Sequence, residues 1–222
     1  MSPKSYDHLL SLLRAFLTQQ RTRICEPILA EIRLAITLRY LASGESQQSL
    51  SWSYRVGRIT VSKIIRETCK LIWKVFSPVY LGNLSTVQEW KEISKEFEDI
   101  WNMPHVLGSI DGKHISIESP KKSGSLYYNY KGFFSIVLLA ICDAKYCFTF
   151  VDIGQYGSGN DSGVLKQSKI NKGFENDQFN IPTASKITGL DEKLPYYLVG
   201  DEIFPLKIWL QRPFPGPLDE SN

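Results

Sequence analysis

The stretch that decides the fold is Val106-Leu-Gly-Ser-Ile-Asp111-Gly-Lys-His-Ile-Ser-Ile-Glu118. It predicts a strand, because apolar residues that favour β-structure recur through a short run. Asp111 stands in the middle of this run, although Asp is depleted in strands and is costly to bury without a partner. Gly112 follows, so backbone or ligand can approach closely. Two interpretations are open: a metal-binding carboxylate on a rigid strand, or an Asp-Gly hairpin turn between two short strands.

A second stretch repeats the pattern: Leu194-Pro-Tyr-Tyr-Leu-Val-Gly-Asp201-Glu-Ile-Phe-Pro-Leu206. Its apolar run ends in Gly200 and then Asp201, which places this acid at the end of a predicted strand rather than on a polar loop. If the two strands are neighbours in one sheet, Asp111 and Asp201 converge. That convergence favours the metal-site interpretation of both acids.

Composition is that of a globular protein. The 222 residues suit one or two domains with a sizeable core. No apolar run approaches the roughly 18 residues of a membrane span, and the first twenty residues do not resemble a signal peptide. The four cysteines lack C-x-x-C spacing, which predicts reduced thiols of an intracellular protein. A disulfide or metal role for Cys142 and Cys147, across a hairpin, is the minor alternative.

Charge is distributed unevenly along the chain. Residues 1–85 hold 12 Lys/Arg and 5 Asp/Glu, a net charge of +7, whereas the remainder holds 14 and 18, a net charge of −4. A basic first part suggests a polyanion-binding module joined to a different one. A basic solvated surface is the alternative.

The first part reads as helical. Apolar residues at helical spacing predict helices over residues 6–20, 27–42 and 47–54, with Gly44 capping the second. A tight turn at residues 56–59 precedes a helix to about residue 76, capped by Thr60 or Ser62 and ended by Pro78. Helix, glycine-containing turn and capped helix form the pattern of a helix-turn-helix.

The last of these helices carries a basic stripe opposite its apolar side. Its members are Lys63, Arg66, Lys70 and Lys74. Such a stripe can contact DNA phosphates while Thr60, Ser62 and Lys63 face the bases. An exposed lysine face on a bundle helix is the alternative, but turn chemistry and charge together favour DNA binding.

The second part of the chain is predicted to contain both helices and strands. A domain boundary is expected near residues 81–85, giving domains 1–84 and 85–222. A helix to residue 101 begins with a capping box, Ser85/Gln88 or Thr86/Glu89. Strands follow at 133–142 and 146–153. A glycine-rich loop lacks the phosphate-loop motif and leads to a short helix, 163–170, capped by Asp161 or Ser162.

The loop from Pro120 to Gly132 interleaves basic and aromatic residues. Lys121, Lys122 and Lys131 suit a nucleic-acid strand with a tyrosine stacking on a base. An ordinary exposed loop fits equally well. His105 and His114 lack ligand spacing with another His or Cys, so structural roles are the simpler interpretation.

Four motifs together resemble one family: GSIDGKH, YNYKGFFSIVLLAICDAKYCFTFVDIG, GSGNDSGVL and VGDEIFPLKIWLQRPFPG. This is the DDE superfamily endonuclease domain of PIF/Harbinger transposases and their nuclease relatives. The resemblance covers Val106 to about Gly216 and implies an α+β fold, with a helix-turn-helix-like helical region before a ribonuclease-H-like mixed sheet. It implies metal-dependent DNA cleavage by a two-metal mechanism, with Mg²⁺ or Mn²⁺ held by Asp111 and Asp201. Asp161 matches a further family acid, with helix capping as its alternative.

One departure from the family bears on activity. The third family acid lies downstream in an R-x-x-x-E-x-x-F-G helix, and Asp219 and Glu220 do not match it. The comparison therefore implies a C-terminally truncated domain whose remaining acids bind metal weakly. Whether the chain is an enzyme stays open, and a catalytically inactive DNA-binding remnant, working with a separate DNA-binding protein, is the alternative. A nuclear location is expected, with the cytoplasm as the alternative.

Overall fold

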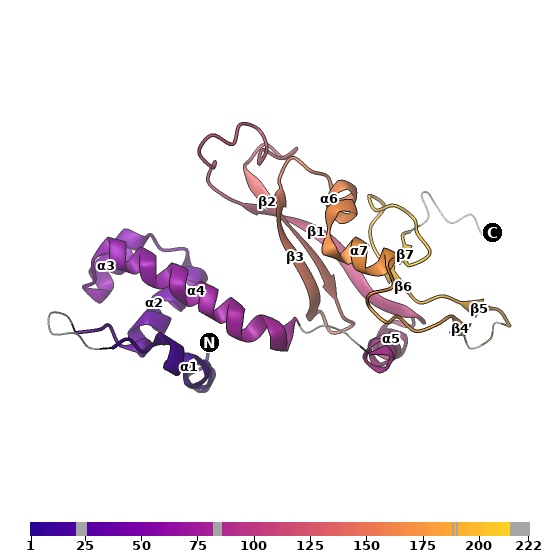
Figure 1. Ribbon diagram of the computed structural model, residues 1–222, viewed down its shortest axis with the longest axis horizontal. Coiled ribbons are helices and arrows are strands. Elements are labelled where there is room, and N and C mark those ends of the chain that lie inside the picture. The colour runs from indigo at the N-terminus through magenta and orange to yellow at the C-terminus, as the bar shows by residue number, and fades with distance from the viewer. Residues whose placement is uncertain (21–25, 82–85, 188, 190, 214–222) are drawn as a thin grey trace. The chain divides into compact units, whose positions relative to one another are not determined.

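The computed structural model describes residues 1–20, 26–81, 86–187, 189 and 191–213, and it forms two compact units, residues 1–79 and 80–222 (Figure 1). The predicted domain boundary between residues 84 and 85 lies outside the described residues, as do Cys25, Asp219 and Glu220. None of the described helices combines the length and the apolar character needed to cross a membrane.

The described residues of the first unit form the helices α1 (Pro3–Leu17), α2 (Ala30–Ser43), α3 (Gln47–Tyr54) and α4 (Arg58–Tyr80). Ser2 caps α1 by accepting a hydrogen bond from the Ser5 backbone N–H. Leu13 and Leu34 are fully buried where α1 meets α2, and Leu50 and Val61 are fully buried in a second cluster. Burial of these side chains, rather than helix propensity alone, is what stabilises helices of this length.

Several helix ends differ from the sequence predictions. Gly44 does cap α2 in the left-handed conformation, as expected, but α2 begins at Ala30 rather than Pro27. Thr60 and Ser62 do not cap α4, because that helix already begins at Arg58. Pro78 lies inside α4, which continues to Tyr80. A proline in the last turn removes only one backbone hydrogen bond, so the helix passes it.

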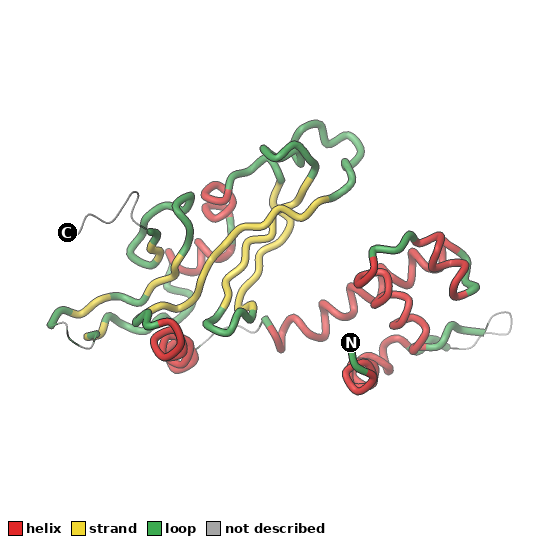
Figure 2. Tube along the Cα trace, turned by 180° about the vertical axis from the view of Figure 1, so that it is seen from behind, coloured by secondary structure: helices red, strands yellow, loops and turns green. Residues whose placement is uncertain are grey.

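The second unit is built on a mixed five-stranded sheet in the order β3-β2-β1-β6-β7 (Figure 2). Its strands are β1 (Val106–Ser116), β2 (Ser135–Cys142), β3 (Phe148–Tyr156), β6 (Tyr197–Val199) and β7 (Leu210–Gln211). The first three pair antiparallel, whereas β6 and β7 run parallel to β1. Together with the helices, this gives the predicted α+β, ribonuclease-H-like architecture. A separate hairpin joins β4 (Ser185–Lys186) to β5 (Lys193–Leu194).

Helices pack on the sheet of this unit. Thr86 and Glu89 form the predicted capping box of α5 (Val87–Trp101). The glycine-rich loop leads into α6 (Asp161–Gln167), whose cap is Asn160, so the prediction of Asp161 or Ser162 as the cap was wrong. In place of the single helix predicted for residues 163–170, the chain forms α6 and a second short helix, α7 (Lys169–Glu175). Residues of α6 and α7 share the largest core with β1 and β2, and this core fixes the strand that carries Asp111.

Candidate active site

Asp111 lies in the middle of β1 with its side chain directed away from the main core. Its neighbour Ile110 is 2% exposed and packs in the core shared with α6 and α7. Successive side chains of a strand point to opposite faces of the sheet, so Asp111 faces the other side. There it lines a cavity of about 510 Å³ and is exposed to solvent. The hairpin interpretation of Asp111 was wrong, because β1 continues through Gly112 to Ser116.

Asp201 follows the end of β6, the strand next to β1, by two residues. Ser109 of β1 pairs with Val199 of β6 in parallel register, and each acid follows its paired residue by two positions. Ser109, Asp111 and Val199 line the same cavity, so Asp201 follows a residue on the same face as Asp111. The adjacency predicted from the sequence is therefore present.

Local backbone groups orient both carboxylates. The Gly112 N–H donates to Asp111 Oδ1 at 2.7 Å, and the Ile203 N–H donates to Asp201 Oδ1 at 3.1 Å. Both acids are exposed. Two oriented, accessible carboxylates, one in β1 and one just beyond the end of the adjacent β6, can bind a cation or position a water molecule.

The cavity beside Asp111 has aromatic walls. Trp101 is fixed by a hydrogen bond from its indole N–H to the Ala144 carbonyl at 2.9 Å, and its ring meets Tyr146 edge-on at 5.8 Å. Phe148 adds a further ring, and Lys113 adds a cation beside the acid. An aromatic cavity with a few charged groups suits an organic group that carries a phosphate.

Asp161 approaches the site from the opposite face. A Cβ atom placed on Gly112 would lie 2.2 Å from Asp161 Oδ1, so only glycine allows this close approach. Gly112 and Ile110 share a face of β1 by strand alternation, which puts Asp161 across the sheet from Asp111. Asp161 Oδ1 is buried and, within the described part of the chain, has no hydrogen-bond partner. A buried polar atom without a partner is unusual and requires a physical reason.

The groups around Asp161 both raise and lower the pKa of its carboxyl. Burial raises the pKa of the Asp161 carboxyl, the charge of His114 lowers it, and Asp111 and Asp201 raise it again. Lys131 adds a smaller lowering effect, and the net pKa is raised. Asp111, Asp201, His114 and Lys131 therefore all lie near enough to act on the Asp161 carboxyl.

Asp161→Asn is expected to raise the free energy of unfolding near neutral pH. The folded-state pKa of Asp161 is raised, so its charged form is penalised in the fold and stability is lost as pH rises through that pKa. Asparagine removes the charge, and the gain should vanish below about pH 4, where an ordinary Asp is also protonated. Urea unfolding in EDTA between pH 4 and 8 measures this. Asp99→Asn, which changes an exposed acid, is the control and should show no gain in the free energy of unfolding. A gain in Asp161→Asn that is equal at pH 4 and pH 8 would contradict the account.

A buried polar network beside these acids was not predicted from the sequence. Asn129 Oδ1 accepts hydrogen bonds from the backbone N–H groups of Lys131 and Phe133, at 3.0 and 3.2 Å. Its Nδ2 donates to Ser135 Oγ at 2.9 Å, and Ser135 Oγ lies 2.9 Å from His114 Nδ1. Asn129 and Ser135 are buried, so this network holds the turn that carries Lys131. The sequence signal was weak, since an Asn and a Ser beside a strand are common in loops.

The donor chemistry of Asp111 and Asp201 fits a divalent ion, because Mg²⁺ and Mn²⁺ prefer carboxylate oxygen. The unpartnered Asp161 Oδ1 is a further acceptor nearby. The described residues nevertheless contain no group of three or more His, Cys, Asp or Glu side chains placed to hold one ion. The opposite-face position of Asp161 explains why it does not complete a group with the other two acids.

The predicted basic residues are all exposed. Lys63, Arg66, Lys70 and Lys74 lie along α4 in the first unit. In the second unit, Lys121, Lys122 and Lys131 lie in the loop before β2. Of these, Lys131 is the one whose charge lowers the pKa of Asp161 among the effects described above. His114 joins the Asn129 network through Ser135. His105 stacks on Tyr196, with the ring centroids 4.1 Å apart.

Comparison with known proteins identifies the family. Residues 110–222 match the family described as "DDE superfamily endonuclease". "Protein ALP1-like" of Arabidopsis thaliana is 30% identical over 97% of this chain and 53% of its own length. "Putative nuclease HARBI1" of Rattus norvegicus is 27% identical over 95% of this chain and 56% of its own. The chain thus spans about half the length of these curated relatives. No solved structure matches it significantly.

Proposed function

Because the chain belongs to the DDE superfamily endonuclease family, we propose that it is a divalent-metal-dependent nuclease that hydrolyses phosphodiester bonds of DNA. The observation that carries this proposal is the position of Asp111 in β1 and of Asp201 two residues beyond the end of β6, the strand that pairs parallel with β1. Two carboxylates placed in this way suit the metal chemistry of phosphodiester hydrolysis.

In this proposal Asp111 and Asp201 hold Mg²⁺ or Mn²⁺ through their carboxylate oxygens. When bound there, such ions would supply positive charge for the attacking and leaving oxygens of a phosphodiester displacement. Lys113, beside Asp111, attracts the phosphate of the DNA strand. The aromatic cavity takes the sugar or base next to that phosphate and excludes water from one side. Asp161 and Lys131 set the charge on the opposite side of β1.

The test of this function is nicking of supercoiled plasmid by the chain in Mn²⁺ or Mg²⁺, with EDTA as the control. Nicked circles that form with metal and not with EDTA support a nuclease. Equal nicking in both buffers would count against a metal-dependent nuclease and point to a contaminating activity.

A second candidate is DNA binding without cleavage. It is favoured because, among the described residues, no third acid completes a metal group with Asp111 and Asp201. The exposed basic stripe of α4 then supplies the function, in a unit whose α3-turn-α4 arrangement resembles a helix-turn-helix. In either case we propose a nuclear location, with the cytoplasm as the alternative, and a separate DNA-binding protein as a partner.

Replacing two stripe lysines is expected to weaken DNA binding and its salt dependence. Each phosphate contact contributes about 0.9 to the slope of log affinity against log salt concentration, so Lys70→Ala with Lys74→Ala should reduce the slope by roughly 2. Fluorescence anisotropy with a labelled duplex at several salt concentrations measures the slope. Lys91→Ala with Lys95→Ala is the matched control, because these are also exposed lysines four residues apart on a helix. An equal change in both double variants would argue against a specific role for the stripe.

A further inference from the structure

Ile59 is an aliphatic side chain that the fold leaves in solvent. It is 87% exposed in the first turn of α4, whereas Val61, Ile64 and Ile65 on the inner side of the same helix are buried. A β-branched residue gives the helix no propensity advantage, and an exposed one contributes little hydrophobic stabilisation. The Ile59 side chain therefore contributes little to the stability of the folded unit and is available to a partner.

The position of Ile59 links it to the basic stripe. Residues 59, 63, 66 and 70 are spaced by four, three and four, so they lie on one face of the helix. The stripe members Lys63, Arg66 and Lys70 are exposed on that face. Ile59 thus extends the stripe to the N-terminal end of α4 with an apolar group.

The backbone before α4 places Ile59 in the first turn of that helix. Arg55 adopts the left-handed conformation (φ 51°) and ends α3, and the Val61 N–H donates to the Gly57 carbonyl at 3.0 Å. The helix therefore begins at Arg58, two residues before the predicted cap at Thr60. This shift brings Arg58 and Ile59 into the first turn, where the sequence prediction had placed only Thr60, Ser62 and Lys63.

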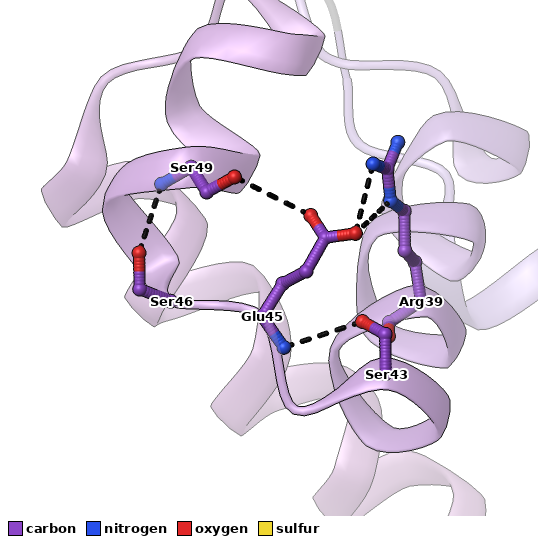
Figure 3. A network of polar contacts seen from close by, with 5 residues as sticks. All are labelled: Arg39, Ser43, Glu45, Ser46 and Ser49. Carbon is purple, nitrogen blue, oxygen red and sulfur yellow. Dashed lines mark hydrogen bonds and ion pairs between the residues drawn. The ribbon is translucent and has the colours of Figure 1, made fainter.

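The electrostatic surroundings suit a polyanion. The first turn of α4 contains no acidic residue. Glu45, at the corner between α2 and α3, accepts a hydrogen bond from Arg39 Nε at 2.9 Å and contacts Ser49 (Figure 3). Glu67 is paired with Arg33 at 2.7 Å and with Lys63 at 3.8 Å. Glu67 is thus matched mainly by Arg33, and Arg58, Arg66 and Lys70 add positive charge around Ile59.

We propose that Ile59 is a base-reading residue that contacts the C5 methyl group of thymine in the major groove of duplex DNA. In a helix-turn-helix, the N-terminal residues of the second helix meet the base edges while flanking cations meet phosphates. The thymine methyl is the one apolar group that the base pairs present in the major groove. This inference rests on the proposed DNA binding of the helical unit and adds the base that the unit distinguishes.

The experiment uses the full chain and begins with selection of a preferred site from a random duplex library. Affinity is then measured for that site and for versions in which single thymines are replaced by deoxyuridine, which lacks only the methyl group. One replacement should weaken wild-type binding about fourfold, the equivalent of one methyl group. Ile59→Ala should bind the thymine and uracil versions equally. The control is Leu41→Ala, which removes an exposed aliphatic side chain of α2 and should keep the fourfold preference for thymine over uracil.

Each outcome decides the proposal. A thymine preference that persists in Ile59→Ala, or is absent from the wild type, would overturn the role of Ile59. Salt-sensitive binding with no preferred site would also overturn it while leaving DNA binding by the stripe intact. Failure to bind any duplex would remove both the base-reading role and the proposed DNA binding of the helical unit.

Discussion

Asp111→Asn and Asp201→Asn are each expected to reduce metal-dependent plasmid nicking by about 100-fold or more, since removal of one electrostatic group at a reacting centre costs roughly 100- to 1000-fold. Asparagine keeps an oxygen that can accept the backbone hydrogen bonds now made by Asp111 Oδ1 and Asp201 Oδ1. It loses the negative charge that a divalent ion requires. The fold should therefore persist while activity falls.

The initial rate of nicked-circle formation in Mn²⁺ measures this loss, with thermal unfolding as the check on folding. Asp99→Asn is the matched control, because Asp99 is an exposed acid on α5 that does not itself line the cavity. If either active-site variant nicked at the wild-type rate, that acid would have no part in the reaction. If both variants unfolded, the loss of nicking would report loss of the fold. A different isostere at each position would then test the charge.

Phe204→Ala is expected to lower the free energy of unfolding by about 3–5 kcal/mol, the usual cost of emptying a buried aromatic site. Phe204 is fully buried in the largest core, and a Cβ atom placed on Gly200 would lie 2.8 Å from its ring. The Phe204 N–H also donates to the Asp201 carbonyl at 3.3 Å. This side chain anchors the turn that carries Asp201, so nicking should fall with stability.

Urea unfolding at constant pH measures this effect. Ile203→Ala is the neighbouring control, because Ile203 is 49% exposed and its removal should cost much less. A Phe204→Ala protein as stable as the wild type would show that the turn is held by other contacts, such as the hydrogen bond from Arg212 Nη1 to the Phe204 carbonyl at 3.3 Å.

The sequence predicted the parts of the site that depend on local pattern. A run of β-forming residues around Asp111, and a second one ending at Asp201, correctly indicated two strands and their adjacency. The capping box of α5 and the glycine cap of α2 were also predicted, since each depends on residue types at short fixed spacing.

The remaining features depend on tertiary packing. Asp161 reaches Gly112 from the far face of the sheet, a position that periodicity cannot give because it depends on how α6 packs. The Asn129–Ser135–His114 network joins residues up to 21 positions apart. The start of α4 was misplaced because Arg55 takes a left-handed conformation that is rare for residues other than glycine and asparagine. The first two features depend on contacts distant in sequence, and the third on a backbone conformation that the residue type does not signal.

The most direct test of the central claim is plasmid nicking by the unaltered 222-residue chain in Mn²⁺, run beside a DNA-binding titration of the same preparation. The account predicts nicked circles that EDTA abolishes and that the Asp111→Asn/Asp201→Asn double variant does not produce. Intact, salt-sensitive DNA binding without any metal-dependent nicking would contradict it, and would identify the chain as a DNA-binding protein that uses the nuclease fold without its chemistry.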